Sequence, residues 1–252
     1  KDFSFKKHIN SLIFHKINGL VGSNIDTLII SSFMGLKAVA IYSTYNYIVN
    51  MLKNILGKIE SSMTAIVGNY LATAKKKLYE LYDEFDSMLF FIAIIVCVPL
   101  TLAINDFIDI WYEGKIATSF LLALSFSSIL FTFIVKMDTT LFVSAGGLYK
   151  ETKLCALTDT IVNLILSLVL VNFLGIAGVL IATAISVFIA EYILKTIVVH
   201  KNIFEVSASK YFIKNIKFFI LYIIDLIGSY YIINLFTINN IIVWFLVFVI
   251  FT

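Results

Sequence analysis

A stripe of polar side chains runs along an otherwise apolar segment, residues 39–72. At about 100° per residue, one helical face of this segment carries Asn46, Asn50, Lys53, Gly57, Glu60 and Thr64. An ionised group near the centre of a bilayer costs on the order of 3 kcal/mol or more. Lys53 and Glu60 must therefore face other helices or water, where they can bind a charged ligand or a charged partner.

A second polar stripe lies within residues 117–145 and comprises Ser125, Ser128, Thr132, Lys136 and Thr139. Lys136 shares this stripe with hydroxyls and no acid, because Asp138 falls on nearly the opposite side of the helix. Lys53 and Lys136 are therefore candidates for a cationic cavity, which the same stripes would also line with Asn46, Asn50 and Thr132. The alternative for Lys53 is an internal ion pair with Glu60 or Asp26 that holds helices together.

Two carboxylates, Asp26 and Glu60, are candidates for binding a coupling ion, H⁺ or Na⁺. The ionisation of a partly buried carboxylate depends on its surroundings, which is the property that coupling needs. The same groups can equally be counter-ions to the lysines. Asp159 and Asn163, one helical turn apart, favour a polar clamp between helices over a cation site.

Other ionisable residues favour structural roles. Glu191 and Lys195 are spaced i,i+4, an arrangement worth only about 0.2–0.5 kcal/mol when exposed, and we expect them near the cytoplasmic end of their helix. Cys97 and Cys155 fall inside apolar segments, where they behave as small apolar residues. The three histidines form no ligand set, so the sequence predicts neither a metal site nor a cofactor.

The composition is that of an integral membrane protein. Of 252 residues, 60% are hydrophobic and only 14% are charged, against roughly 25% charged in soluble domains. The mean hydropathy is +0.98, and the apolar runs lack the alternation of a transmembrane barrel. No basic stripe with interleaved aromatic residues occurs in a polar segment, which argues against nucleic acid as a partner.

Hydropathy predicts an all-α bundle of about eight transmembrane helices. The expected elements are an interfacial arm at 1–16, six spans at 17–35, 39–72, 87–105, 117–145, 152–173 and 176–199, a surface helix at 73–86, a loop from 200, a seventh span at 212–235 and an eighth from 240. The second span would be ~51 Å long against a ~30 Å bilayer core, with Gly57 as the expected bend. The chain begins without methionine and stops inside an apolar run, so we expect a piece of a longer protein.

The lysines predict the orientation in the membrane. Those outside the spans are concentrated in the arm at 1–16, the 73–86 segment, the 147–153 turn and the 200–217 segment, whereas the intervening connections hold only Lys37 and Lys115. Because cytoplasmic loops are enriched in basic residues, the lysine-rich side is predicted to be cytoplasmic.

Three segments resemble one family of transporters. The first is NLILSLVLVNFLGIAGVLIATAIS at 163–186, the second is DTLIISSFMGLKAVAIYSTY at 26–45, and the third is DFIDIWYEG at 106–114. Together, and in this order, they resemble the polysaccharide and oligosaccharide-lipid flippases of the multidrug/oligosaccharidyl-lipid/polysaccharide exporter superfamily.

The resemblance implies two six-helix lobes that rock about a central cavity. Residues 17–199 would form the second, C-terminal lobe, and 200–252 a cytoplasmic loop with two additional helices, the last truncated; the N-terminal lobe is missing from this chain. The implied function is to flip an undecaprenyl-pyrophosphate-linked oligosaccharide across the bacterial plasma membrane, among membrane lipids and driven by H⁺ or Na⁺.

Two alternatives to this function stay open. A drug or cation antiporter of the same superfamily would prefer a cavity dominated by carboxylates, against which the lysines on two stripes argue. A membrane-embedded glycan polymerase or acyltransferase would need a catalytic base or a metal site fed by a sizeable loop. The predicted external connections are short and contain no histidine, so we expect a protein that is not an enzyme.

Overall fold

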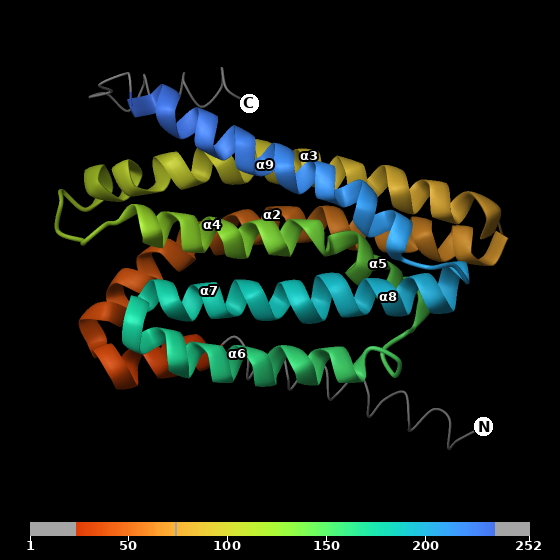
Figure 1. The fold of residues 1–252 in the computed structure, drawn as a ribbon, viewed down its shortest axis with the longest axis horizontal. Helices are drawn as coiled ribbons and strands as arrows, with labels where there is room; N and C mark the ends of the chain where they lie inside the picture. The colour runs from red at the N-terminus through yellow and green to blue at the C-terminus, as the bar shows by residue number, and fades with distance from the viewer. Residues whose placement is uncertain (1–23, 74, 235–252) are drawn as a thin grey trace.

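The computed structural model describes residues 24–73 and 75–234, and this part of the chain is helical apart from short turns. Residues 24–34 form a helix that leads through Gly35 into the long helices of Figure 1. These are α2 (Leu36–Thr73), α3 (Lys75–Trp111), α4 (Phe120–Val135), α5 (Met137–Gly146), α6 (Lys153–Leu174), α7 (Ile176–Val187), the π-helix η1 (Phe188–Leu194), α8 (Lys195–Val199), the π-helix η2 (His200–Phe204) and α9 (Ser209–Asn234).

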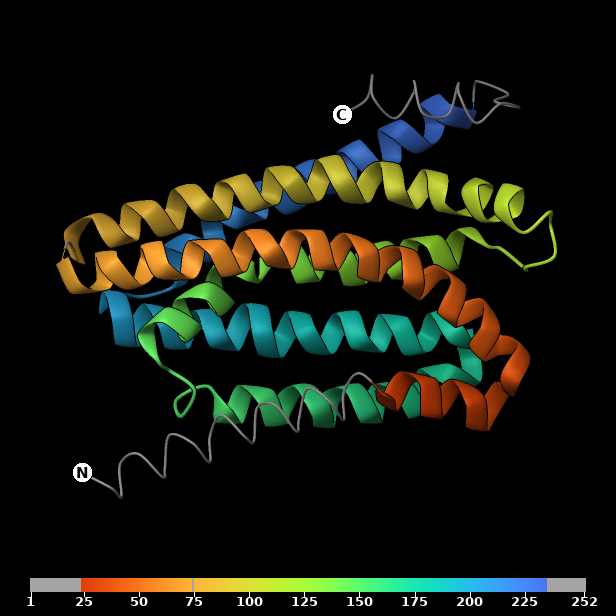
Figure 2. The ribbon, with the colours of Figure 1, turned by 180° about the vertical axis from the view of Figure 1, so that it is seen from behind.

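The long helices lie side by side in a layered bundle. Helices α3 and α9 pack against each other on one side, α6 lies on the other, and α4 and α7 lie between them (Figures 1 and 2). Helix α2 packs against α3, α4 and α5. The core between the layers is filled by aromatic and aliphatic side chains, among which Tyr45, Phe90, Phe126 and Tyr192 are almost wholly buried.

The outer surface of the bundle is apolar. Phe91 is 63%, Phe173 79% and Ile224 61% exposed, and large exposed apolar surfaces of this kind face lipid or another protein. Four helical stretches are long and apolar enough to cross a membrane: Lys77–Trp111, Phe120–Gly146, Lys153–Leu174 and Ile176–Phe204. The chain is therefore a helical membrane protein.

The predicted surface helix at 73–86 is wrong. Residues 75–86 continue without a break into the third predicted span as the single helix α3. The junction around Asp86 and Ser87 contains neither glycine nor proline, so nothing ends the helix there. The apolar face of the segment does exist, but Leu78 and Tyr82 are 1% and 0% exposed, because that face packs on the bundle and not on a membrane surface.

Other predicted spans agree with the observed helices to different degrees. Helix α6 follows its prediction closely, whereas the fourth span divides at Lys136 into α4 and α5, and the sixth runs on to Phe204. Helix α2 is continuous through Gly57 and curves along its length (Figure 2). The arm at 1–16, the start of the first span and the eighth span lie outside the described residues, so the total of eight spans stays a prediction.

The connections between helices separate into two ends. Those from α2 to α3, from α5 to α6 and from η2 to α9 lie at one end, and those from α3 to α4 and from α6 to α7 lie at the other (Figure 1). The first set adjoins the lysine-rich segments, whereas the second end has Lys115 and, after the turn at Gly35, Lys37. Among the described connections, the lysines are thus more numerous at one end, as the predicted topology requires.

A tight hairpin joins α6 to α7. Gly175 has φ 59° and ψ −133°, a backbone conformation that is essentially restricted to glycine. A Cβ atom on Gly178 would lie 2.2 Å from the backbone oxygen of Leu170. These two glycines therefore allow α6 and α7 to pack in close contact.

Candidate functional site

Lys136 occupies the junction at which the fourth span is interrupted. Its backbone, at φ −96° and ψ −4°, lies in the sparsely populated bridge region, and α4 ends there while α5 begins one residue later. The Nζ atom lies 3.4 Å from Oε2 of Glu191, and the side chain is 21% exposed. Lys136 therefore has an acidic partner on another helix. The polar stripe of its own segment contains no acid, so the sequence pattern did not predict this partner.

Glu191 is shared by two lysines. It lies in the π-helix η1, a type of segment that is frequent at functional sites, and its Oε2 also pairs with Nζ of Lys195 in the following turn. The side chains of Glu191 and Lys195 are 10% and 8% exposed. The predicted i,i+4 pair is thus present but buried, and with Lys136 it forms a triad of two ammonium groups and one carboxylate.

Lys53 is the least compensated cation of the candidate site. Its side chain is half-buried, and no carboxylate of the described chain lies within ion-pair distance of it. Its Nζ lies 5.7 Å from the centroid of the Phe133 ring, and Lys136 and Asp26 are near enough to interact with it electrostatically. The structure thus does not contain the internal ion pair of Lys53 with Glu60 or Asp26 that was the alternative to a cavity role.

The polar stripe of α2 lies at the margin of the packed face of the helix. The adjacent stripe, formed by Tyr42, Tyr45, Val49 and Leu56, is buried in the core. Of the polar residues, Asn46, Lys53 and Glu60 are partly exposed and Asn50 is exposed. Because these groups cannot face lipid without cost, the stripe requires water, a polar ligand or further protein beside it.

Asp26 joins the first described helix to the α6–α7 hairpin. It is 6% exposed, and the Thr183 hydroxyl lies 3.1 Å from each of its carboxylate oxygens as a donor. Asn163 donates from Nδ2 to Thr183 Oγ1 at 2.9 Å, and Ser167 donates to Asn163 Oδ1 at 3.2 Å. The clamp predicted at Asn163 is present, and it reaches Asp26 through Thr183.

The remaining candidates take different positions. Glu60 forms no ion pair with any described lysine but interacts electrostatically with Lys136 and Lys195. Asp159 also interacts electrostatically with Lys136, Lys195 and Glu191, and its Oδ1 accepts no hydrogen bond within the described part. Thr132 is buried, and its hydroxyl donates to the backbone carbonyl of Ile129 in the same helix at 3.0 Å. This hydrogen is therefore not available to a ligand in the predicted cavity.

The triad together with Lys53, Glu60 and Asp159 forms the candidate site. It is a mixed-charge cluster, and these six residues carry three potential positive and three potential negative charges. Sequence reasoning found Lys53, Lys136 and Glu60 from helical spacing. It missed the part of Glu191 and Lys195 in the cluster, because spacing along one helix does not show which other helix lies opposite.

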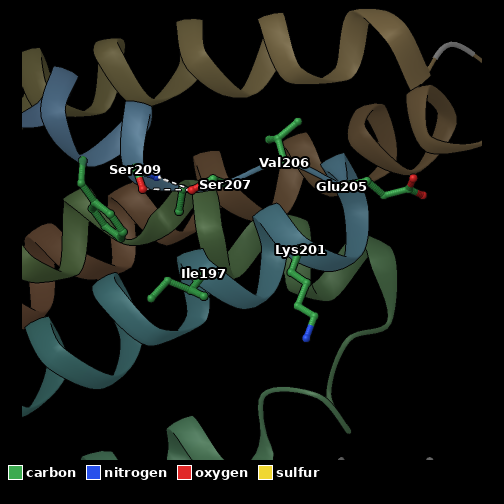
Figure 3. A pocket seen from close by; sticks show the side chains of 8 residues that line it. Ile197, Lys201, Glu205, Val206, Ser207 and Ser209 are labelled. Atoms are coloured by element: carbon green, nitrogen blue, oxygen red, sulfur yellow. Dashed lines mark hydrogen bonds between the residues drawn. The ribbon is translucent and has the colours of Figure 1, made fainter.

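A hollow of about 710 Å³ lies away from this cluster, at the lysine-rich end of the bundle, between η2 and the start of α9. Its lining includes Lys201, Glu205, Ser207 and Ser209. The charged ends of Lys201 and Glu205 point away from the two serine hydroxyls (Figure 3). These groups do not converge on one point, so the charged cluster remains the better candidate site.

Comparison of the chain with protein-family models, with characterised proteins and with solved structures found no match. A functional conclusion must therefore come from the site itself.

Proposed function

We propose that this chain is one lobe of a membrane transporter that flips an undecaprenyl-pyrophosphate-linked oligosaccharide across the bacterial plasma membrane. The observation that carries the proposal is Lys53, a half-buried cation on a partly exposed polar stripe, with no carboxylate within ion-pair distance in the described chain. We expect its helix, α2, to lie in the membrane. Intramembrane ionisable residues of this kind mark substrate pathways.

The named groups supply the interactions that such a substrate needs. Lys53 binds the pyrophosphate, and two unit charges 4 Å apart attract by about 4 kcal/mol at an effective dielectric constant of 20. The triad adds an ammonium group, since its two lysines share one carboxylate. Asn46 and Asn50 offer amides along the same stripe for hydrogen bonds to sugar hydroxyls. Alternating access then exposes this stripe to each side in turn while the lipid tail stays in the bilayer.

A drug or cation antiporter is the second candidate. It is favoured by one specific observation: Glu60, Asp159 and Asp26 bring carboxylates to the same region, and Asp159 Oδ1 accepts no hydrogen bond in the described structure. An organic cation would bind these carboxylates and be repelled by Lys53.

Alanine substitutions at the chromosomal locus distinguish the two functions. Lys53→Ala is the test, and Lys58→Ala is its matched control, because Lys58 is on the same helix but exposed and about 140° around the axis. A flippase loses glycolipid translocation in Lys53→Ala, measured as glycolipid retained in the cytoplasmic leaflet, and keeps it in Lys58→Ala. If both variants translocate glycolipid normally and Glu60→Gln abolishes drug efflux, the protein is an antiporter.

A further inference from the structure

Two buried carboxylates outside the candidate site share one tyrosine hydroxyl. Tyr211 of α9 donates to Asp86 Oδ1 of α3 at 2.8 Å, and its oxygen lies 3.3 Å from Asp138 Oδ2 of α5. The two aspartates are 0% exposed and Tyr211 is 1% exposed. Three helices distant in sequence therefore meet at one hydroxyl group within the protein interior.

The two carboxylates have unequal partners. Asp86 also accepts from Nδ2 of Asn215 at 3.1 Å, and its Oδ2 lies 3.1 Å from Nζ of Lys214. Asp138 accepts from the backbone N–H of Thr139 at 2.6 Å through Oδ1. No lysine of the described chain lies within ion-pair distance of Asp138.

The single hydrogen of Tyr211 cannot serve both carboxylates. The Tyr211 hydroxyl carries a single hydrogen, and the shorter bond to Asp86 uses it. Asp138 Oδ2 then faces the Tyr211 oxygen without a hydrogen between them. A hydrogen on Asp138 Oδ2 would donate to this oxygen and complete the chain from Asp138 through Tyr211 to Asp86.

Burial favours that extra hydrogen. A fully buried carboxylate without a cation is strongly disfavoured and normally neutralises. Asp138 is in the first turn of α5, where the helix dipole favours an anion, but this effect is much smaller than the cost of full burial.

The charged and titratable groups around Asp138 do not supply a cation. Nearest to it are Asp86 and Tyr82 of α3, Tyr192 of η1, His200 of η2, and Tyr211 and Lys214 of α9. Lys214 is bound to Asp83 and Asp86. Helices α2 and α8 also pack on α5, but Lys195 of α8 pairs with Glu191 and Lys53 of α2 interacts with Lys136 and Asp26. Lys136, two residues before Asp138, directs its ammonium group to Glu191.

We propose that the Asp86–Asp138 pair is a binding site for one exchangeable proton, carried by Asp138, with Tyr211 as the relay. In the relay step the Oδ2–H bond of Asp138 breaks as a new O–H bond forms on Tyr211. The original Tyr211 O–H bond breaks as its proton passes to Asp86 Oδ1. The positive charge moves from one carboxyl group to the other, and no other bond changes.

Asp86, at one end of the relay, is connected to solvent through Lys214. Lys214 and Asp83 are 27% and 43% exposed and pair at 2.6 Å, and Lys214 is also the ion-pair partner of Asp86. A proton on Asp86 therefore lies next to groups that reach solvent at the lysine-rich end. This inference goes beyond the proposed function, since it concerns a proton and not the transported molecule.

Infrared titration of the full-length protein in lipid nanodiscs tests the site. The carbonyl stretch of a buried protonated carboxylic acid is expected at neutral pH in the unmodified protein. It should disappear in Asp138→Asn and persist in Asp109→Asn, a control whose carboxylate contacts Thr118 at the opposite end of the bundle. Tyr211→Phe should keep the band but shift its frequency and its titration midpoint, because the carboxylic acid loses its acceptor.

Three results would overturn the inference. The first is the absence of a protonated acid at neutral pH in the unmodified protein. The second is a band that survives in a folded Asp138→Asn protein, as judged by circular dichroism. The third is a band that Tyr211→Phe leaves unchanged, and this result decides the question even if Asp138→Asn does not fold.

Discussion

Replacing Glu191 with glutamine should destabilise the protein strongly. This carboxylate is the shared partner of Lys136 and Lys195, and it is only 10% exposed. Glutamine keeps the size of the side chain and removes its charge, so the variant leaves two lysines without an acidic partner. Removing one member of a buried pair is costly because the remaining charge is desolvated and uncompensated.

The expected size follows from the burial of the two lysines. Lys195 is 8% exposed, and loss of its partner alone is expected to cost about 3 kcal/mol, the lower end of the range for buried pairs. Lys136, at 21% exposed, can move toward water and adds little. In a chain of this size each kcal/mol lowers Tm by about 2–4 °C. Glu191→Gln should therefore lower Tm by about 6–12 °C.

Thermal unfolding in detergent micelles measures the effect in Glu191→Gln, Lys195→Met and the double variant. The double variant removes both buried charges together, so it should recover most of the lost stability. A Glu191→Gln protein whose Tm falls by less than about 2 °C would refute the reasoning. So would a double variant that is less stable than both single variants, because the two residues would then not act as a pair.

Two further substitutions test the packing and the clamp by the same measurement. Gly178→Ala should lower Tm, because its Cβ would lie 2.2 Å from the backbone oxygen of Leu170 and overpacking costs about 1–3 kcal/mol. In the control Gly57→Ala, the added Cβ meets nothing within 4 Å, so Tm should stay unchanged or rise. Thr183→Val should cost about 1–3 kcal/mol, because buried Asp26 loses its hydroxyl donor, and Thr183→Ser should restore the stability. An unaffected Gly178→Ala or Thr183→Val protein would show that the hairpin or the clamp has been misjudged.

Helical spacing within one segment was sufficient for part of the site. The polar stripe of α2 was predicted from residue types alone, and its position beside the buried stripe of Tyr45 and Val49 agrees with a helix that has one polar margin. The prediction that Lys136 and Asp138 do not pair with each other was also made from spacing. In the structure Lys136 pairs with Glu191, and Asp138 lies next to Tyr211. Both inferences depend only on the 3.6-residue period.

Contacts between helices could not be predicted in this way. Lys136 and Glu191 lie on different helices, and no pattern in either helix indicates the other. The pairing of Asp86 with Tyr211 has the same origin, because α9 reaches α3 only through tertiary packing. The apolar face of residues 78–85 was found, but a period cannot distinguish a face that packs on protein from one that packs on lipid.

The most direct test of the proposed function is the affinity of the full-length protein for an undecaprenyl-pyrophosphate-linked oligosaccharide, measured in lipid nanodiscs. Loss of one charge-assisted contact of about 1.5–3 kcal/mol corresponds to a roughly 10- to 150-fold weaker Kd. We predict this weakening for Lys53→Ala and an unchanged Kd for Lys58→Ala. Equal affinities of the two variants and the unmodified protein would contradict this prediction, because Lys53 would then not contact the pyrophosphate.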